Sequence, residues 1–427
     1  MPSGWQSFAI GDLFEIGAGK SVTPQARNGE RAHPFLRTSN IFWGRVDVSD
    51  VSTMHFTDEE IESKSLRVGD LLVCEGGDIG RSAIWSGELQ HCGFQNHLHR
   101  LRARSDDVVA RFAMYYLQAG FTQLGIYEGA GNKTTIPNLS RSRLAALKIP
   151  LPPKPEQQKI AAVLWKIQRA IAVQDRLLDA TADLKQSAMQ RLFTHGTRGE
   201  PLKDTPIGPM PESWTPTPIG SLGTVVTGST PKTSVAGFYV NGDLPFIAPG
   251  DIGEATEISD TVKKITEAGM AVSRVLPAGS TCVVCIGSSI GKVGFSTQER
   301  SASNQQINSI IPNDSYDARY VCHLLQFHSK HVASRAAPSP VAILSKSQFS
   351  AIELPVSEDA GEQRAIASAL AAIDRKLVHH RRKRAALDAL FQTTLHDLMT
   401  ARRRVVDLEI DVSEVADSVQ PPQGAAA

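Results

Sequence analysis

PEQQKIAAVLWKIQRAIAVQDRLLDATADLKQSAMQRLF, residues 155–193, is the stretch that decides the fold. Its apolar side chains fall at helical spacing, at Ile160, Leu164, Ile167, Ile171, Leu178, Leu184, Ala188 and Leu192. This pattern predicts an amphipathic helix of about ten turns. Because a helix this long and this amphipathic buries its apolar face against a partner, we expect a second long helix beside it.

Residues 361–399, GEQRAIASALAAIDRKLVHHRRKRAALDALFQTTLHDLM, supply that partner within the same chain. The two stretches share one heptad phase, because their first four apolar residues are about 206 positions apart. The predicted packing seam consists of Ile160, Leu164, Ile167, Ile171, Leu178, Ile366, Leu370, Ile373, Leu377, Leu387 and Phe391. Gln174 and His380 occupy matching heptad positions, so a polar interruption near the middle of each helix can fix the register. Two matched helices in one chain predict a spacer with pseudo-twofold symmetry.

The bulk composition is that of a soluble protein of two or more domains. The chain has 427 residues, 41% hydrophobic and 21% charged, and 45 Lys and Arg against 44 Asp and Glu. With a net charge of +1, any nucleic-acid surface must come from local clusters of cations. Five scattered cysteines indicate reduced thiols. Without a long apolar run or a signal pattern, we expect a cytoplasmic protein and no membrane contact.

Short motifs of the first half return in the second half in the same order. IGDL at 10–13 returns as IGSL at 219–222, PFL at 34–36 as PFI at 245–247, and QNHL at 95–98 as NQQI at 304–307. One module is therefore used twice. Runs such as 70–74 and 280–287 predict strands, and stretches 108–117 and 317–327 predict helices, which gives an α+β class for each globular half.

These patterns divide the chain into six segments. We expect a globular half at 1–153, a long helix at 154–195, a linker rich in proline and glycine at 196–213, a second globular half at 214–355, a second long helix at 356–404 and a disordered tail at 405–427.

The duplicated half, its proline-rich exit, the pairs Glu156-Gln157 and Glu362-Gln363 and the long helix after each pair together resemble the specificity subunit of type I DNA restriction-modification systems. The resemblance extends over residues 1 to about 403 and rests on the order and duplication of the motifs. It implies that each half is a target recognition domain reading one part of a split, asymmetric DNA site, and that the helices form an antiparallel coiled coil that sets the gap.

The same resemblance implies that catalysis belongs to partner subunits. Two methyltransferase subunits would bind S-adenosylmethionine, and restriction and translocase subunits would use ATP with Mg. This chain would be a non-catalytic subunit that binds double-stranded DNA and no cofactor of its own. The rival interpretation is a coiled-coil scaffold whose paired domains bind protein or carbohydrate, and the salt dependence of DNA binding separates the two.

Side chains able to reach base edges or phosphates are the candidate DNA contacts. In the first half they are Lys20, Arg37, Ser39, Asn40, Arg81, His97, Arg100, Lys133 and Thr134. In the second half they are Lys232, Lys263, Lys264, Lys292, Gln305 and Arg335. For any one of them a solvated surface position is the competing interpretation. Because the halves should read different bases, non-repeating residues are favoured as readers. Two interpretations remain for the basic run 379–384. It contacts DNA phosphates, or it is a helix surface that faces solvent or a partner subunit.

Two motifs suggest other chemistry and are better explained by the fold. Gly17–Ser21 ends like a phosphate-binding loop, but Phe14 stands where that loop needs its first glycine, so we expect a turn after a strand. Cys282 and Cys285 have the spacing of a redox pair or half a zinc site. No second pair accompanies them, so we expect buried strand thiols and no metal site.

Overall fold

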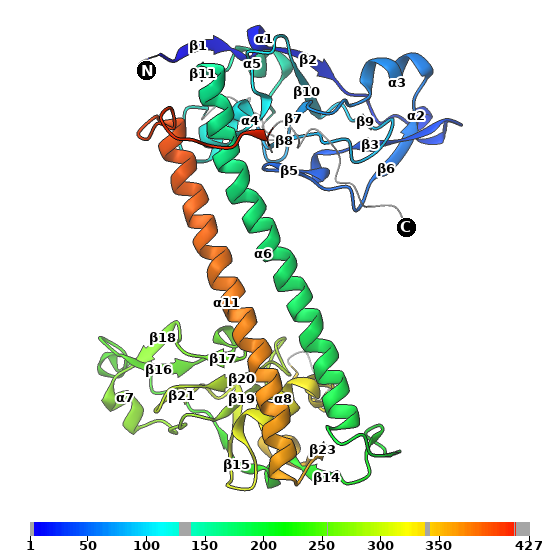
Figure 1. Ribbon diagram of the computed structural model, residues 1–427. Helices are drawn as coiled ribbons and strands as arrows, with labels where there is room; N and C mark the ends of the chain where they lie inside the picture. The colour runs from blue at the N-terminus through cyan, green and yellow to red at the C-terminus, as the bar shows by residue number, and fades with distance from the viewer. Residues whose placement is uncertain (1–3, 128–137, 254, 338–341, 414, 416–427) are drawn as a thin grey trace. The chain divides into compact units, whose positions relative to one another are not determined.

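A computed structural model describes residues 4–127, 138–253, 255–337, 342–413 and 415. The chain forms two compact units (Figure 1). Unit 1 comprises Met1–Val173 with Arg384–Ala427, and unit 2 comprises Gln174–Lys383. Each unit joins one globular half to parts of both long helices, α6 (Lys154–His195) and α11 (Ala360–Met399).

Unit 1 contains three sheets that matter for the site. A four-stranded sheet has the order β2 (Phe14–Ala18), β10 (Leu98–Ala103), β7 (Leu71–Cys74) and β8 (Ser82–Ile84). A three-stranded sheet has the order β6 (Ser52–His55), β3 (Ala32–Leu36) and β9 (Gly93–Phe94). A third pairs β1 (Gln6–Ala9) with β11 (Lys148–Leu151).

Unit 2 repeats this plan. Its larger sheet has the order β15 (Gly223–Thr227), β22 (Ile307–Pro312), β19 (Thr281–Val284), β20 (Val293–Ser296) and β17 (Glu257–Ile258). The smaller sheet has β18 (Lys263–Ile265), β16 (Leu244–Ile247) and β21 (Ala302–Ser303). A pair joins β14 (Thr215–Pro218) to β23 (Glu353–Val356). The predicted α+β class with two homologous halves is confirmed.

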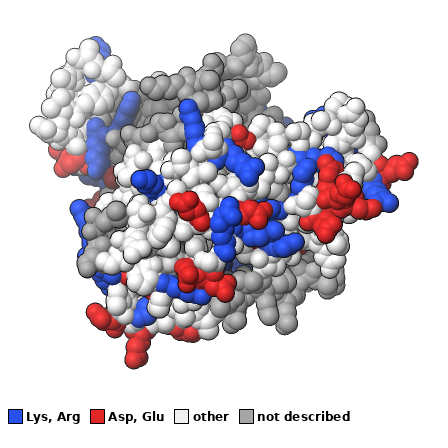
Figure 2. Space-filling model, turned by 90° about the horizontal axis from the view of Figure 1, so that it is seen from above, with Lys and Arg blue, Asp and Glu red and all other residues white. Residues whose placement is uncertain are grey.

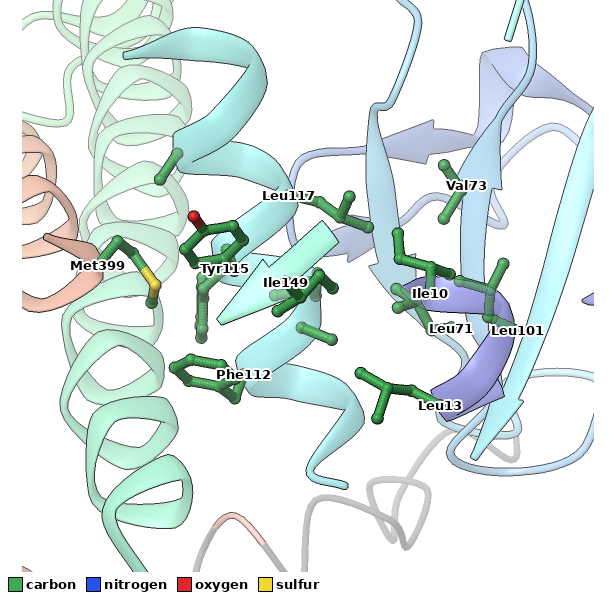
Figure 3. Packing of buried hydrophobic residues seen from close by; sticks show 14 of the residues in the cluster. Ile10, Leu13, Leu71, Val73, Leu101, Phe112, Tyr115, Leu117, Ile149 and Met399 are labelled. Carbon is green, nitrogen blue, oxygen red and sulfur yellow. The ribbon is translucent and has the colours of Figure 1, made fainter. Parts of the chain in front are cut away.

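The core of unit 1 forms where the globular half meets the long helices. Helix α4 (Ala110–Thr122) is buried along ten consecutive residues, because the sheet covers one side and the long helices cover the other. Figure 3 shows Phe112 and Tyr115 of α4 between Met399 of α11 and Ile149 of β11, with Leu71 and Leu101 on the sheet side. Helix α8 (Ala318–Phe327) has the same place in the core of unit 2.

The long helices bury the predicted seam. In unit 1, Ile160 and Leu164 are fully buried and pack in one cluster with Phe391, while Ile167 and Ile171 are partly buried against it. In unit 2, Ile366, Leu370 and Leu377 are buried and Ile373 is partly buried. Leu178 and Leu387 are half-buried. Leu184 departs from the predicted pattern, since 53% of it is exposed.

Two polar contacts in unit 2 show that the helices run antiparallel there. Gln174 Oε1 lies 2.9 Å from His380 Nδ1, and Lys185 Nζ lies 2.7 Å from Asp374 Oδ1. Residue numbers therefore rise along α6 as they fall along α11. Gln174 is 4% exposed, so the polar interruption predicted from heptad position is a buried contact between the two helices. A buried polar pair of this kind holds one register, because a shift would leave both side chains without a partner.

A buried glutamine near the start of each long helix ties the helix to its globular half. Gln157 Oε1 accepts from the backbone N–H of Val109 (2.9 Å), and its Nε2 donates to the carbonyls of Asp107 and Pro152. Gln363 repeats this set with the N–H of Asp317 (2.8 Å) and the carbonyls of Ser315 and Ser357. The repeated Glu-Gln pairs therefore mark where each helix docks.

The segments after the long helices are more ordered than the sequence suggests. The predicted linker contains a hairpin, β12 (Leu202–Lys203) with β13 (Met210–Pro211), and Met210 is buried in the core of unit 2. Val405, which we assigned to a disordered tail, is buried in the core of unit 1, and Ile410 packs against that core. Residues 414 and 416–427 of the predicted tail lie outside the described residues. No described helix combines the length and apolarity needed to cross a membrane.

Candidate nucleic-acid interface

A polar hollow of about 580 Å³ opens beside the three-stranded sheet of unit 1. Strand β6 contributes two small hydroxyl side chains, and the turn after β9 contributes two amides and a histidine. The wall consists of Ser21, Val22, Arg27, Phe35, Arg37, Ser52, Thr53, Gln95, Asn96 and His97. Donors and acceptors converging in one hollow are what the reading of base edges and phosphates requires.

The backbone around this hollow explains why the Gln95 segment recurs in both halves. Lys20 N–H donates to the Phe94 carbonyl (2.9 Å), and Asn96 N–H donates to the Lys20 carbonyl (3.0 Å). The strands approach so closely that a Cβ on Gly19 would lie 2.2 Å from the Gln95 carbonyl oxygen. In unit 2 a Cβ on Gly228 would lie 2.0 Å from the Asn304 carbonyl oxygen. The glycine of the Gly17–Ser21 run is thus needed for strand contact, in agreement with the predicted turn.

The strand register shows which residues of unit 2 occupy the positions of this wall. Strand β3 pairs Phe35 with Ser52 and Pro34 with Thr53. Strand β16 pairs the matching Phe246 with Lys263 and Pro245 with Lys264. Two hydroxyl side chains in unit 1 therefore correspond to two lysines in unit 2.

The turn that begins with Arg37 also has the same backbone in both units but a different side chain. It is a short 3-10 turn, Thr38–Asn40, and its counterpart in unit 2 is Pro249–Asp251. Asn40 accepts from the Arg37 N–H at 2.9 Å, and Asp251 accepts from the Ala248 N–H at 2.8 Å. The position of the Arg37 guanidinium thus holds a methyl group in unit 2.

Two predicted contacts in unit 1 are buried and have hydrogen-bond partners within the protein. Asn40 is 3% exposed, and its side chain donates to the carbonyls of Asp47 and Asp50. Arg100 is 5% exposed and donates to the Ser63 carbonyl (2.9 Å), and burial lowers the pKa of its guanidinium. Neither side chain can reach a duplex without unfolding its surroundings.

Other predicted cations of unit 1 are neutralised by carboxylates. Lys20 forms an ion pair with Glu60 and lies 5.1 Å from the ring centre of Phe56. Although burial raises the pKa of Glu60, the bonds from Lys20 and from the Thr57 N–H dominate and bring it to about 2. Arg81 pairs with Asp78 at 2.7 Å. Lys20 and Arg81 therefore have partners within the protein.

Three predicted residues of unit 1 do face solvent on or beside the hollow. The side chain of His97 is 58% exposed, that of Arg37 is 31% exposed, and Ser39 is exposed. Arg37 Nη2 lies 3.0 Å from Asp50 Oδ2, a carboxylate that is itself 88% exposed. Lys133 and Thr134 lie outside the described residues. No local motif marks Arg27, Ser52 or Thr53, and strand pairing with β3 brings Ser52 and Thr53 to the wall.

The predicted cations of unit 2 are less constrained. Lys232, Lys263, Lys292 and Arg335 are exposed, and within the described residues none of the four has an ion pair. Lys264 pairs with Asp260 at 3.0 Å. Figure 2 shows basic and acidic side chains interspersed on the face it presents, which agrees with a net charge of +1.

Two of these lysines, Lys232 and Lys292, lie beside other polar residues of unit 2. Thr230 donates to Gln305 Oε1 (2.6 Å), which ties the loop carrying Lys232 to the Asn304–Gln306 turn. Lys292 lines a second hollow, of about 350 Å³, together with Lys330, a residue that the sequence did not single out.

The cysteines behave as buried thiols. Cys282 and Cys285 are free and buried, and burial raises the pKa of each thiol to about 11. Within the described residues no group of three or more His, Cys, Asp and Glu side chains could hold a metal ion. The spacing of these two cysteines therefore reflects a buried strand.

The duplicated fold defines a class: a protein with two homologous α+β domains, each joined to parts of two long helices, and with different side chains at matching positions of the two domains. The family profile described as "Type I restriction modification DNA specificity domain" matches residues 2–180 and again residues 211–388. The chain therefore belongs to this family and is a type I restriction-modification specificity subunit with two target recognition domains.

Individual relatives agree with this assignment. The chain is 21% identical over 425 residues to the type I restriction enzyme MjaVIII specificity subunit of Methanocaldococcus jannaschii, covering 96% of this chain and 95% of that one. It is 26% identical over 246 residues to the EcoR124I/EcoR124II specificity subunit of Escherichia coli, covering 56% and 57%. The structure of an S subunit from M. genitalium matches with a TM-score of 0.63 at 16% identity, over 92% of this chain and 96% of that one.

Proposed function

We propose that this chain reads a bipartite, asymmetric DNA site, one half-site with each recognition domain, and performs no catalysis itself. The observation that carries the proposal is the set of different side chains at matching positions of the two halves. Arg37, Ser52 and Thr53 on one frame correspond to Ala248, Lys263 and Lys264 on the other. Two domains with one backbone and different donors and acceptors are suited to reading two different base sequences.

The complex that this role requires contains further subunits. Two methyltransferase subunits would bind S-adenosylmethionine and modify the bases, and restriction subunits would use ATP and Mg to translocate and cleave. The specificity chain would bring these activities to the site it reads. The role also requires a compartment that contains DNA, so the cytoplasm is its expected location.

The experiment is to map methylated positions in DNA from cells that make the full complex with variant specificity chains. We expect Arg37→Ala to relax the base requirement in one half-site and Lys263→Ala to relax it in the other. Removal of a good base contact costs about 1–3 kcal/mol of discrimination, so the affected positions should accept other bases about 5- to 150-fold more often.

Arg191→Ala on the exposed surface of α6 is the matched control, because it removes one arginine and changes none of the residues compared between the two recognition domains. It should leave both half-sites unchanged. If Arg37→Ala and Lys263→Ala altered the same half-site, the assignment of one domain to each half would be wrong. No DNA binding by the assembled complex, or weak binding that does not respond to salt, would instead favour the scaffold interpretation.

A further inference from the structure

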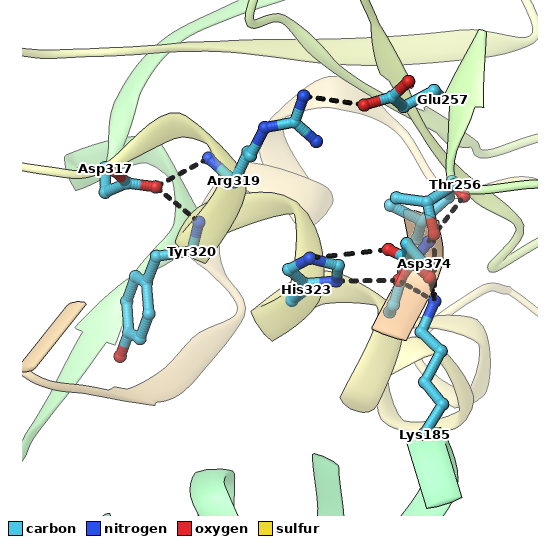
Figure 4. A network of polar contacts seen from close by, with 10 residues as sticks. Lys185, Thr256, Glu257, Asp317, Arg319, Tyr320, His323 and Asp374 are labelled. Carbon is cyan, nitrogen blue, oxygen red and sulfur yellow. Dashed lines mark hydrogen bonds and ion pairs between the residues drawn. The ribbon is translucent and has the colours of Figure 1, made fainter. Parts of the chain in front are cut away.

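A buried charged cluster joins the recognition domain of unit 2 to both long helices (Figure 4). Lys185 of α6 pairs with Asp374 of α11 at 2.7 Å, with side chains 16% and 11% exposed. Lys185 Nζ also donates to Thr256 Oγ1 at 2.9 Å and to Gln326 Oε1 at 3.3 Å. His323 of α8 is fully buried, with its Nε2 3.6 Å from Asp374 Oδ2. Three helices thus meet at one ion pair.

The repeat identifies the counterpart of this cluster in unit 1. Helix α4 begins ARFAMYYLQ and helix α8 begins ARYVCHLLQ, so Tyr115 corresponds to His323. The shared heptad phase of the long helices, about 206 residues apart, makes Gln168 correspond to Asp374 and Phe391 to Lys185. Each junction therefore takes one residue from the recognition helix, one from α6 and one from α11.

The junction of unit 1 contains no charge at these three positions. Tyr115 is fully buried and its hydroxyl donates to Gln168 Oε1 at 2.6 Å. Its ring meets the ring of Phe391 edge to face, with centroids 6.1 Å apart. An aromatic pair and a Tyr115–Gln168 hydrogen bond thus replace an ion pair and a histidine, and the buried Arg111 guanidinium also hydrogen-bonds the Tyr115 side chain.

A junction that combines residues from the two units leaves a buried charged group without its partner. If Lys185 alone became phenylalanine, the Asp374 carboxylate would lie in the junction without a cation. If Asp374 alone became glutamine, the Lys185 ammonium would lose its carboxylate. Removing one partner of a buried pair is far more destabilising than replacing the whole set by a neutral one of similar volume.

We propose that these two junctions are the positioning elements of the recognition domains, and that each is a matched set that works only when complete. Lys185, Asp374 and His323 hold the second recognition domain in one orientation on the helices. Tyr115, Gln168 and Phe391 do the same for the first. This inference rests on the proposed function, because the orientation of a reading domain fixes where its half-site begins.

The test converts the junction of unit 2 to the kind found in unit 1, in the full-length chain. Lys185→Phe and Asp374→Gln should each lower the Tm of unit 2 by about 10 °C. The triple variant Lys185→Phe, Asp374→Gln, His323→Tyr should return to within about 3 °C of the wild type. Asp179→Gln, at an exposed carboxylate on α6, is the control and should not change Tm.

A second measurement separates positioning from general stability. In the complex with its partner subunits, Asp374→Gln should methylate sites whose gap differs by a base pair from the native gap, with both half-site sequences unchanged. A purely structural defect would reduce methylation at native sites and leave gap preference unchanged. The triple variant should regain the native gap.

Three results would overturn the proposal: a triple variant no more stable than the single ones, single variants as stable as the wild type, or a gap preference that no variant changes. Failure of the proposed function is distinguishable, because the Tm comparison needs no DNA. Where Asp374→Gln yields no folded chain, Asp374→Asn supplies the same charge removal with a smaller side chain, and the same three comparisons apply.

Discussion

Gln157 and Gln363 make the same contacts in their two units, whereas the glutamates before them do not. Glu156 binds Arg404, which follows α11, with Nη2 to Oε2 at 2.8 Å. Glu362 instead accepts from the Thr197 N–H (2.7 Å), which follows α6, and from Trp214 Nε1 and Ser357 Oγ. The glutamines bind backbone groups that both units share, so their contacts are repeated. The glutamates bind the segments that follow the long helices, and because these segments differ, we call the glutamate contacts specialised.

The largest expected effect is at the specialised glutamate of unit 2. Glu362 is 3% exposed and satisfies two buried donors, Trp214 Nε1 and Ser357 Oγ, besides the N–H of the exposed Thr197. Glu362→Ala therefore leaves two buried donors without this acceptor. At about 1–3 kcal/mol for each orphaned group, we expect a loss of about 4 kcal/mol in unit 2. Hydrogen exchange followed by mass spectrometry on peptides of unit 2 measures it.

Glu156→Ala is the matched variant in unit 1. Arg404 is 35% exposed and can turn to water, so the loss should be only about 1 kcal/mol. Equal losses in the two units would show that the two glutamates serve the frame in the same way and would contradict the division drawn above.

The repeated glutamines should behave alike. Gln157→Ala and Gln363→Ala each remove the acceptor of one backbone N–H and the donor of two backbone carbonyls at the start of a long helix. We expect about 2 kcal/mol of lost stability in the unit concerned, the same within error for both. Urea unfolding monitored by hydrogen exchange separates the units, and a clear inequality would show that the docking is not equivalent.

Acid should weaken unit 2 before unit 1. Burial lowers the pKa of His323 and of His328 from 6.5 to about 4. Between these values the unfolded chain binds protons that the folded unit excludes, so this stability is present above pH 6.5 and is lost as pH falls toward 4. In unit 1 the lowered pKa of Glu60, about 2, acts only below its ordinary value of 4.5.

Limited proteolysis at pH 7 and pH 5 checks the order of opening. Peptides of unit 2 should be released first at pH 5, and His328→Asn should reduce the difference, because asparagine binds no proton. Release of unit 1 peptides first would contradict the assignment of acid sensitivity to the two buried histidines.

The paired helices and the two homologous halves could be predicted from the sequence, because the first follow from a periodic pattern and the second from repeated motifs. The heptad phase gives Gln174 and His380 matching positions, where the structure shows a contact, and the repeats identify two homologous halves. Leu184 was the exception, since an apolar residue at helical spacing can still face solvent. Val405 was assigned to a tail by local composition, although tertiary packing buries it.

The candidate site was predictable only in part. Arg37 lies on the wall of the hollow in unit 1, and Lys263 lies at the matching strand position in unit 2. Arg100 is buried on β10, the strand between β2 and β7. The sequence alone does not distinguish a basic strand residue that faces solvent from one that faces the core. Ser52 and Thr53 were missed because they reach the wall through pairing with β3, which no local motif marks.

The smallest expected effect concerns the exposed cations, and it sharpens the contrast between the units. Lys232 and Lys292 are exposed without an ion pair among the described residues, whereas Lys20 is paired with Glu60. Each phosphate contact contributes about 0.9 to the slope of log K against log salt. If Lys232 or Lys292 touches a phosphate, its change to alanine should lower the slope by about that amount, while Lys20→Ala should leave it unchanged. Titration of the assembled complex with duplex DNA at several salt concentrations measures the slope. A lower slope for Lys20→Ala alone would show that the Glu60 pair opens on binding, so the paired and unpaired cations of the two units would then do the same work.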